Sequence, residues 1–175
     1  CSGGSAANTI AGVASLGGRG AFIGKVRDDH LGDIFYHEIR AAGVTFDTPA
    51  ATSGPQTATS LILVSPDAQR TMQTFLGACV GFGPDDIDED AIAAAEVTYL
   101  EGYLWDPPEA KTACIKAAEI AHAAGREVSL TLSDPFCVDR HRADFLDLTK
   151  NHVDILFANE EEIKSLYQVD NFDHA

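Results

Sequence analysis

The strongest constraint on the fold is an alternation of strand-like and helix-like segments in the second half of the chain. Residues 97–101, 127–134 and 153–159 are runs of β-branched and apolar residues with the length of strands. Between the first two runs, residues 108–124 carry apolar residues at helical spacing and end before Gly125. This βαβαβ order predicts an α/β fold with a parallel sheet that is covered on both faces.

Polar residues stand at the end of each predicted strand. Glu101, Asp134 and Asn159 close the three runs. Ligands of open parallel sheets bind beyond the carboxyl ends of the strands. We therefore expect these three side chains at one rim of the sheet, where a site would lie.

The N-terminal segment, residues 1–8, brings two glycines and a carboxamide to the start of a predicted helix over residues 7–16. Gly3 and Gly4 let a ligand approach the backbone, and the N–H groups of a helix start point toward it. Asn8 can both donate to and accept from a hydroxyl group, so the segment suits a polyol as well as a phosphate. The alternative is a glycine-rich turn that enters a core helix and binds nothing.

Two further elements are predicted before residue 83. Residues 20–26 form a strand, and Asp28-Asp29 opens a helix that Gly43 ends. Residues 57–65 and 70–76 form a hairpin around the turn at 66–68. The second strand of the hairpin alternates polar and apolar residues, as a lid over a ligand would. The alternative is an edge hairpin that extends the main sheet.

The order of several short sequence blocks resembles the ribokinase or PfkB superfamily of ATP-dependent sugar and nucleoside kinases. Within this superfamily, the chain is most similar to adenosine kinases. The resemblance covers nearly the whole chain. It implies a three-layer α/β sandwich with a mostly parallel central sheet, a small β lid formed within 20–26 and 57–76, and the βαβαβ core from 97. The blocks that carry it are Gly3-Gly4-Ser5-Ala6-Ala7-Asn8, Ala21–Val26 with Asp28–Gly32, Asp67–Arg70, Tyr99–Tyr103, Leu130–Phe136 and Val153–Glu162.

The resemblance also indicates what this chain does not contain, so we expect an internal segment of a larger kinase, incomplete at both ends. The first strand of the family would precede Cys1, and the Gly-Ala-Gly-Asp signature with the catalytic aspartate would follow Ala175. The 175 residues contain no Gly-x-Gly-Asp run. Arg27 stands where many members of the family have a turn glycine, which leaves the local backbone open.

The resemblance assigns the substrate side of the site to the first half of the chain. Gly3, Gly4, Ser5 and Asn8 would hold ribose or sugar hydroxyls. Arg70 would lie near the transferring phosphoryl group, where a planar guanidinium positions and neutralises charge; the alternative is an exposed charge at the end of a hairpin. The residues predicted to line the nucleobase pocket are Met72, Thr74 and Leu76, which share one face of their strand.

Asn159 and Glu162 match the Asn-x-x-Glu motif of the family and would serve ATP and Mg²⁺. Mg²⁺ keeps several waters and is held by few carboxylates, so Glu162 would act through water. Glu160 and Glu161 are expected to be solvated, although the acidic run leaves the alignment ambiguous by one residue. Glu101 and Asp134 would lie at the edge of the pocket.

Charge and cysteine content exclude several classes of function. The net charge of −15 argues against nucleic acid or an anionic membrane as a partner. No apolar run approaches the length that spans a membrane. Cys1, Cys79, Cys114 and Cys137 show no C-x-x-C spacing, which is typical of free thiols in a reducing, cytoplasmic compartment.

The sequence thus predicts an ATP- and Mg²⁺-dependent kinase that phosphorylates the primary hydroxyl of a nucleoside, adenosine first and a free sugar second. Two alternatives remain open. An NAD-dependent oxidoreductase is disfavoured because Gly3-Gly4 lacks the G-x-G-x-x-G spacing. The other alternative is a non-catalytic binding or dimerisation module on a kinase scaffold. A homodimer would form through the lid.

Overall fold

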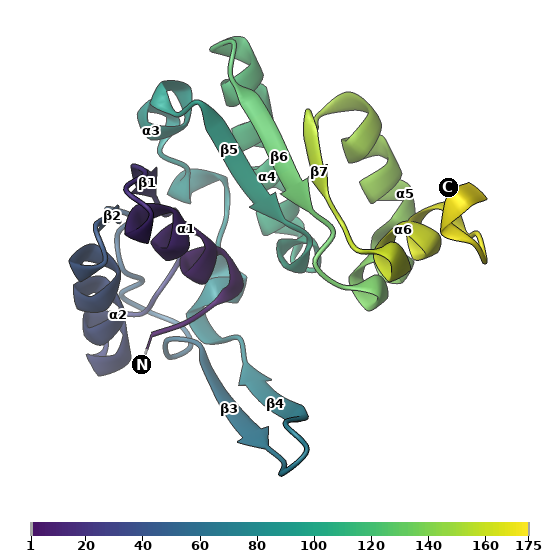
Figure 1. Ribbon diagram of the computed structural model, residues 1–175. Coiled ribbons are helices and arrows are strands. Elements are labelled where there is room, and N and C mark those ends of the chain that lie inside the picture. The colour runs from purple at the N-terminus through teal and green to yellow at the C-terminus, as the bar shows by residue number, and fades with distance from the viewer. Residues whose placement is uncertain (1, 175) are drawn as a thin grey trace. The chain divides into compact units, whose positions relative to one another are not determined.

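The computed structural model describes residues 2–174, which form two compact units, 2–82 and 83–174 (Figure 1). Each unit is described by itself. Cys1, the first residue of the glycine-rich segment and one of the four expected free thiols, lies outside the described residues.

The first unit packs two helices on a small pair of parallel strands. These are α1 (Ser5–Ser15), α2 (His30–Ala41), β1 (Gly20–Ala21) and β2 (Val44–Thr45). Burial of apolar side chains from α1, α2, β2 and the segments that follow the two strands stabilises the unit. Phe46 is fully buried and contacts three other rings, with Tyr36 stacked at a centroid distance of 4.4 Å. The buried core of this unit consists of Ala7, Val26, Ile39, Val44 and Phe46.

The strand predicted over residues 20–26 is shorter than expected. Only Gly20 and Ala21 pair with β2, and they do not pair with the lid hairpin. Parallel pairing resumes at a single bridge between Arg27 and Ala51. Pro49 lies in the partner segment between the two paired regions and has no N–H to donate to a ladder, which accounts for the interruption.

Arg27 fits its position without a displaced loop. Its φ angle is negative, so the backbone there needs no glycine. The close approach falls instead at Gly32, where a Cβ would lie 2.0 Å from the Arg27 carbonyl oxygen. Gly43, at φ +88°, ends α2 as predicted.

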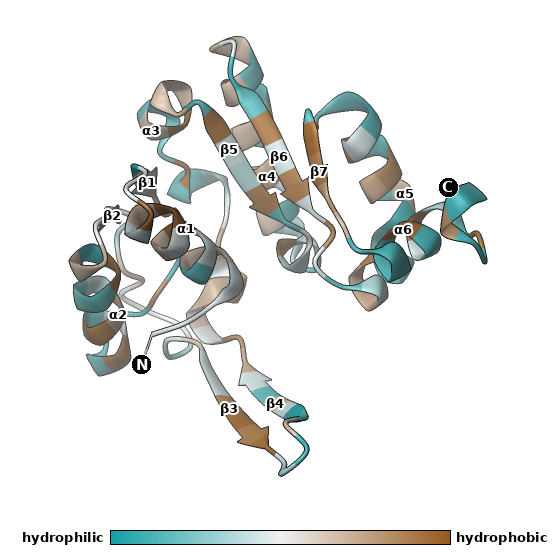
Figure 2. Cartoon of the chain, in the orientation of Figure 1, coloured by the Kyte–Doolittle hydropathy of each residue, from teal (hydrophilic) through white to brown (hydrophobic). Residues whose placement is uncertain are grey.

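The hairpin consists of β3 (Thr59–Val64) and β4 (Arg70–Phe75), which pair antiparallel and in register from Thr59 with Phe75 to Val64 with Arg70. Every residue of both strands is exposed, and in the described residues the hairpin is a separate two-stranded sheet. It projects from the rest of its unit, and β3 is strongly hydrophobic (Figures 1 and 2). In the described residues the hairpin does not extend another sheet, and its role as a lid stays a prediction.

The second unit is built on three parallel strands in the order β5 (Val97–Glu101), β6 (Glu127–Thr131) and β7 (Ile155–Phe157). Parallel neighbours need a crossover connection. The crossovers contain α4 (Pro108–Ala123) and α5 (Pro135–Asn151), and α3 (Glu89–Ala94) and α6 (Glu160–Tyr167) flank the strands. The largest fully buried side chains in this unit are Trp105, Val128, Leu130, Leu132, Val138, Phe145, Leu148 and Leu166.

Two of the predicted strands end earlier than expected. Residues 127–134 and 153–159 give strands of five and three residues. Ser133 has φ +72°, which stops β6, and Asp134 then caps α5 by accepting a hydrogen bond from the Phe136 N–H. Asn159 likewise caps α6. Asp134 and Asn159 therefore begin helices and do not end strands, because short polar side chains compete for helix N–H groups.

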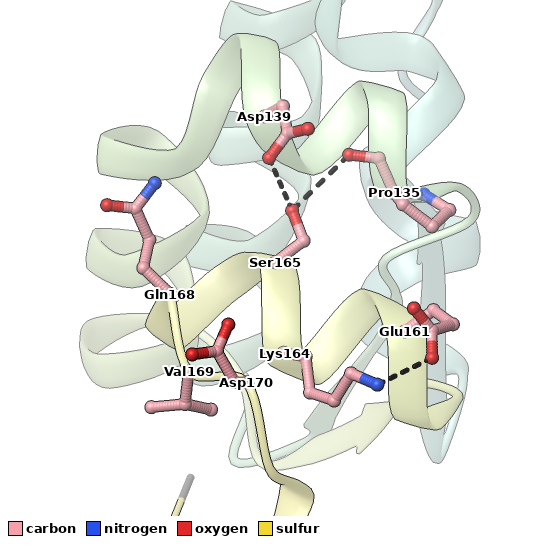
Figure 3. Close-up of a pocket in the computed structure, with 8 residues that line it drawn as sticks. All are labelled: Pro135, Asp139, Glu161, Lys164, Ser165, Gln168, Val169 and Asp170. Carbon is pink, nitrogen blue, oxygen red and sulfur yellow. Dashed lines mark hydrogen bonds and ion pairs between the residues drawn. The ribbon is translucent and has the colours of Figure 1, made fainter.

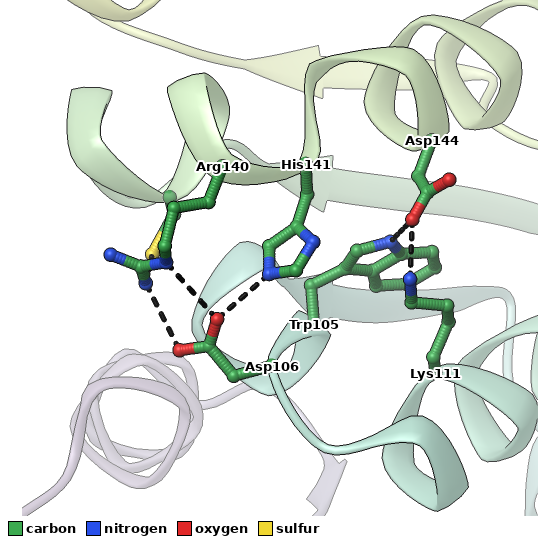
Figure 4. A network of polar contacts seen from close by, with 7 residues as sticks. Trp105, Asp106, Lys111, Arg140, His141 and Asp144 are labelled. Carbon is green, nitrogen blue, oxygen red and sulfur yellow. Dashed lines mark hydrogen bonds and ion pairs between the residues drawn. The ribbon is translucent and has the colours of Figure 1, made fainter.

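A polar network joins α4, α5 and the 3-10 turn Gly102–Trp105 (Figure 4). Asp106 accepts hydrogen bonds from Arg140 at 3.2 and 3.0 Å and lies 2.7 Å from the His141 ring nitrogen. Asp144 accepts from the Trp105 indole at 3.0 Å and from Lys111. α5 is kinked at His141, whose φ and ψ are −125° and 25°, so the network fixes the kinked helix on its neighbours.

The described cysteines are free thiols, as predicted. Cys79 is half-buried, and Cys114 and Cys137 are buried. Burial raises the pKa of Cys114 to about 12, so this thiol packs as a small apolar group. In residues 2–174, no helix is both long enough and apolar enough to span a membrane.

Candidate active site

The predicted substrate residues of the first unit gather at the start of α1. Gly4 is the N-cap of this helix, with φ +111°, and no side chain caps the helix. A Cβ at Gly3 would meet nothing within 4 Å, so the approach to the backbone is open. The first N–H groups of a helix have no partner inside the helix. An uncapped start behind two glycines can therefore donate hydrogen bonds to a ligand.

Asn8 lies one turn into the same helix and is exposed. No group in residues 2–174 forms a hydrogen bond with its carboxamide, whereas the neighbouring Thr9 hydroxyl donates to the Ser5 carbonyl at 3.1 Å. The structure thus brings Gly3, Gly4, Ser5 and Asn8 together at one exposed helix end. A carboxamide and backbone N–H groups suit a ligand with hydroxyl groups, which both donate and accept.

The hairpin places three of the four predicted residues on one face. Arg70, Met72 and Thr74 alternate along β4 and pair with residues 64, 62 and 60 of β3. The Thr74 hydroxyl lies 2.9 Å from that of Ser60. The prediction that Leu76 shares this strand face is wrong. Leu76 follows the end of β4 and has a helical backbone conformation, so the alternation of the strand does not include it.

The opposite face of the hairpin is apolar as well. Leu61, Leu63 and Phe75 alternate with the first set and are 66%, 70% and 52% exposed. A two-sided apolar hairpin has large hydrophobic surface on both faces, and exposed apolar patches of this kind mark ligand or partner contacts.

In the second unit, the register of the sheet brings the predicted polar residues to one end. Glu101 pairs with Thr131, which pairs with Phe157. Asp134 and Asn159 follow β6 and β7 within three residues, at the same carboxyl end. Glu101 is buried, with 6% of its surface exposed, and accepts a hydrogen bond from the Tyr99 hydroxyl at 3.3 Å.

Tyr103 is a rim residue that the sequence analysis did not single out. Its hydroxyl donates to the Ser133 carbonyl at 3.0 Å. Burial raises the pKa of Tyr103, and the negative charges of Asp134, Glu101 and Glu162 add to that effect. The side chain is still 49% exposed, so Tyr103 lies at the surface of the rim. The sequence could have indicated Tyr103, because the Tyr99–Tyr103 block runs from the strand onto the rim.

Phe136 is a second such residue. It is the second residue of α5, after Pro135, and is 73% exposed, although it is a large aromatic side chain. Single exposed apolar residues are common on proteins. Its place beside Asp134 makes it a candidate for stacking on a planar group. Its signal was the Asp-Pro-Phe end of the Leu130–Phe136 block.

Asn159 and Glu162 form a reciprocal cap at the start of α6. The Asn159 Oδ1 accepts from the Glu162 N–H at 2.9 Å, and the Glu162 carboxylate accepts from the Asn159 N–H at 3.1 Å and from its Nδ2 at 2.8 Å. Glu162 is 5% exposed. The motif that the sequence assigned to ATP and Mg²⁺ thus has a structural role as a capping box.

This geometry is compatible with magnesium held through water. Within residues 2–174 there is no group of three or more His, Cys, Asp or Glu side chains that could hold a metal ion directly. Mg²⁺ keeps most of its waters and takes oxygen donors, with substrate phosphates supplying part of the set. A fixed carboxylate such as Glu162 fits an orienting role toward metal-bound water.

A shallow depression of about 440 Å³ lies between the start of α5 and the length of α6 with the residues that follow it (Figure 3). Ser165 donates to Asp139 at 2.6 Å across it, and Lys164 pairs with Glu161 at 2.7 Å. Of the residues that the sequence analysis considered for the site, only the alternative carboxylate Glu161 lines this depression. The polar pairs satisfy one another, so the depression gives no independent support for a site.

Comparison with known proteins supports the kinase assignment. Residues 2–175 match the pfkB family carbohydrate kinases. The crystal structure of adenosine kinase from Sinorhizobium meliloti superimposes with a TM-score of 0.95 and 57% sequence identity, covering 99% of this chain and 54% of that chain. A probable sugar kinase from Rhizobium etli gives a TM-score of 0.94 and 57% identity, covering 98% and 52%. This confirms the predicted α/β class and the ribokinase-like fold.

A curated relative, the ATP-dependent ribose-1-phosphate kinase of Halopiger xanaduensis, is 32% identical over 169 residues, which are 95% of this chain and 52% of that protein. The chain therefore spans about half the length of the proteins it matches. The matches extend along the whole described chain and lie in a kinase family, so the dehydrogenase alternative is not supported. The chain belongs to the pfkB family of carbohydrate kinases.

Proposed function

We propose that the protein is an ATP-dependent kinase that phosphorylates the primary hydroxyl of a ribose-containing nucleoside, adenosine first and a free sugar second. The observation that carries this proposal is the exposed start of α1, with its glycines and the Asn8 carboxamide, which has no hydrogen-bond partner among residues 2–174. The 57% identity to an adenosine kinase favours a nucleoside. The sugar kinase and ribose-1-phosphate kinase among the relatives keep sugars as the second candidate.

The start of α1 would orient the acceptor. Asn8 and the backbone at Gly3, Gly4 and Ser5 would hydrogen-bond the ribose hydroxyls and fix the direction of the primary hydroxyl. In the reaction, that oxygen attacks the γ-phosphorus of ATP, the bond to the β,γ-bridging oxygen breaks, and ADP leaves. Phosphoryl transfer of this kind depends mainly on positioning and on charge neutralisation.

The hairpin would close over the acceptor. Met72 and Thr74 would contact the nucleobase, with Leu76 at the base of the hairpin outside the strand, and Arg70 would approach the transferred phosphoryl group. Glu101 would lie at the edge of the pocket. Arg70 is a good candidate because a guanidinium stays charged and presents several N–H donors in one plane.

Asn159 and Glu162 would serve the phosphates of ATP and the magnesium ion. Magnesium, when bound with ATP, neutralises phosphate charge. Glu162 would orient a metal-bound water, since its carboxylate is already fixed by Asn159. The aspartate that takes the proton from the acceptor hydroxyl is proposed to lie outside these 175 residues, which contain no Gly-x-Gly-Asp run.

The net charge of the chain and the exposed apolar face of the hairpin indicate which partners to propose. A net charge of −15 disfavours nucleic acid and anionic membranes, and free thiols favour the cytoplasm. A homodimer through the lid would cover the face with Leu61, Leu63 and Phe75. Size-exclusion chromatography with light scattering of the intact protein and of a Leu61→Ser/Leu63→Ser variant would test it, with loss of the dimer expected in the variant.

The function is tested by ADP release from the intact protein with ATP, Mg²⁺ and one acceptor at a time. The acceptors are adenosine, ribose, fructose and ribose 1-phosphate, beside a blank without acceptor. We expect the highest kcat/KM with adenosine. A preference for a sugar would select the second candidate. Binding of ATP and adenosine without turnover, or binding of neither, would support a non-catalytic module.

A further inference from the structure

The two ends of the hairpin are joined directly below its last strand pair. The Ala78 N–H donates to the Gln56 carbonyl at 2.8 Å. Gly77 has φ +54°, and a Cβ on it would lie 2.1 Å from the same Gln56 oxygen. Only glycine allows this approach, so residues 56–58 and 76–78 form one tight root, which we call the hairpin root.

Thr57 attaches this root to the loop before α2. Its N–H donates to Asp29 Oδ2 at 2.9 Å, and its hydroxyl donates to Asp29 Oδ1 at 2.7 Å. The same hydroxyl oxygen accepts from the Arg27 N–H at 3.0 Å. Thr57 is 6% exposed. Both carboxylate oxygens of Asp29 therefore contact one buried residue of the root.

Asp29 also caps α2, because its Oδ1 accepts from the Gly32 N–H at 2.8 Å. The hydrogen bond from the Thr57 N–H is the main cause that lowers the pKa of Asp29, and the Gly32 N–H adds to it. One carboxylate thus connects the start of a packed helix with the base of an exposed hairpin. A capping role alone would need the contact with Gly32 and would leave Thr57 unused.

Because the hairpin is exposed, the attachment of its root to Asp29 affects the direction in which the hairpin points. All residues of β3 and β4 are exposed, so the strands themselves make few contacts that could hold the hairpin at an angle. Six residues at about 3.3 Å each give a lever of about 20 Å, so a tilt of about 10° at the root moves the far end, where Arg70 begins β4, by about 3 Å. Displacements of about 1 Å can already reduce a reaction rate by about a hundredfold.

We infer that Asp29, acting through Thr57, is a positioning residue that sets the direction of the hairpin and thereby the placement of Arg70, Met72 and Thr74 over the acceptor. This inference rests on the proposed kinase function for its kinetic consequence. The attachment itself is independent of that function. Two hydrogen bonds from one residue to both oxygens of a carboxylate restrict rotation as well as distance, which a single bond would not do.

Three variants separate this role from helix capping. Asp29→Asn keeps one oxygen for the Gly32 N–H, and asparagine is a good N-cap, but its amide nitrogen cannot accept from the Thr57 N–H. Thr57→Val removes the hydroxyl at nearly constant volume, and Thr57→Ser restores it. Asp88→Asn is the matched control, because Asp88 caps α3 through the Ala91 N–H at 2.9 Å and belongs to the second unit.

The kinetic arm measures kcat and KM of the intact protein for acceptor and ATP. In Asp29→Asn and Thr57→Val we expect kcat/KM for the acceptor to fall by about tenfold or more, with the KM for ATP changed by less than about twofold. Thr57→Ser and Asp88→Asn should stay close to the wild type. Unchanged acceptor kinetics in both damaging variants, or failure of Thr57→Ser to restore them, would overturn the inference.

Hydrogen exchange provides the arm that does not depend on activity. In Thr57→Val, the amides of the hairpin root, including Ala78, should exchange at least about tenfold faster, because the opening free energy of this region is lowered. The amides of α2 should keep their protection. If the amides of the hairpin root in Thr57→Val exchanged at the same rate as in the wild type, the inference would be contradicted. If the wild type phosphorylates none of the acceptors, the proposed function fails, while the exchange measurement still decides whether Asp29 and Thr57 hold the root.

Discussion

Asn159 and Glu162 hold the start of α6 by hydrogen bonds in both directions: Asn159 Oδ1 accepts from the Glu162 N–H at 2.9 Å, and the Glu162 carboxylate accepts from the Asn159 N–H at 3.1 Å. A motif associated with ATP and magnesium is therefore also a helix cap. The two roles are compatible, since a carboxylate that is fixed by the cap is oriented before a metal-bound water arrives.

The first prediction concerns this carboxylate. Glu162→Gln keeps an oxygen for the Asn159 N–H but removes the charge, so the helix should remain capped while the orientation of metal-bound water weakens. We expect the Mg²⁺ concentration for half-maximal rate to rise by about tenfold or more, with acceptor KM nearly unchanged. A magnesium titration of the initial rate measures this.

Glu160→Gln is the matched control, because the Glu160 side chain lies on the same turn and is 64% exposed. It should leave the titration unchanged. A titration of Glu162→Gln that superimposes on that of the wild type would transfer the role to Glu161 or remove it from this motif.

The second prediction concerns Asn8. Asn8→Ala in the intact protein should weaken nucleoside or sugar binding by about 1 to 3 kcal/mol, or about ten- to a hundredfold, because hydrogen bonds to the acceptor hydroxyls are lost. ATP binding should change much less. Isothermal titration calorimetry with each ligand measures both. Thr9→Ala removes a hydroxyl that bonds within the helix, and this control should bind like the wild type; an equal loss in both variants would point to damage to α1.

The third prediction concerns Arg70. Arg70→Gln removes the charge at the start of β4, so kcat should fall by about tenfold to a thousandfold if the guanidinium stabilises the transferred phosphoryl group. Acceptor KM should change little. Gln73→Ala lies on the opposite face of the same strand and is the control for hairpin structure. Steady-state kinetics in which Arg70→Gln and Gln73→Ala behave alike would assign Arg70 to an ordinary surface charge.

The fourth prediction concerns stability at Asp144. Trp105 is 1% exposed, and its indole N–H donates to Asp144 at 3.0 Å. Asp144→Ala leaves this buried donor without an acceptor and should lower the free energy of unfolding by about 1 to 3 kcal/mol. Asp144→Asn keeps a carbonyl oxygen and should cost less. Urea denaturation followed by circular dichroism compares the two, and equal losses would show that the indole contact is not the cause.

The fifth prediction is a pH dependence that arises from Asp106. The hydrogen bond with His141, and then that with Arg140, lowers the pKa of Asp106 below its ordinary value of 3.8. The folded state therefore binds fewer protons than the unfolded state in this range, so the stabilisation is complete above the unfolded pKa and is lost as pH falls through the folded pKa.

Asp106→Asn removes this contribution. The difference in unfolding free energy between wild type and Asp106→Asn should be constant well above the ordinary pKa of 3.8 and should shrink as the pH falls below it. Denaturation curves on both sides of this pKa measure it. A difference that does not change with pH would show that Asp106 contributes through packing alone.

The local sequence predicted the limits of three helices, although α1 begins at Ser5 and not at residue 7. Asp29 and Gly43 predicted the limits of α2, and the apolar spacing with Gly125 predicted α4 to within one residue. Caps and helical periodicity act over a few residues, so they can be recognised without knowledge of the fold. The same locality explains why Gly3-Gly4 and Asn8 could be placed at a helix start.

Strand lengths were less predictable. Strand propensity continued to residue 134, but Ser133 adopts a left-handed conformation and Asp134 turns to cap α5. The run 20–26 contains good strand residues, yet only two of them find partners. A strand extends only as far as a neighbour offers N–H and carbonyl groups, and that neighbour is distant in sequence.

The sequence by itself therefore predicted the α/β class and the limits of several helices, and it offered candidate contacts to an acceptor and magnesium that stay predictions. Tertiary structure decided which residues that are distant in sequence contact one another. It joined the Tyr103 hydroxyl to the Ser133 carbonyl, separated Leu76 from the strand face of Met72 and Thr74, and joined Asp29 to Thr57 across 28 positions of sequence. Such contacts arise when packing closes long loops, and no local pattern encodes which distant groups will satisfy one another's hydrogen bonds.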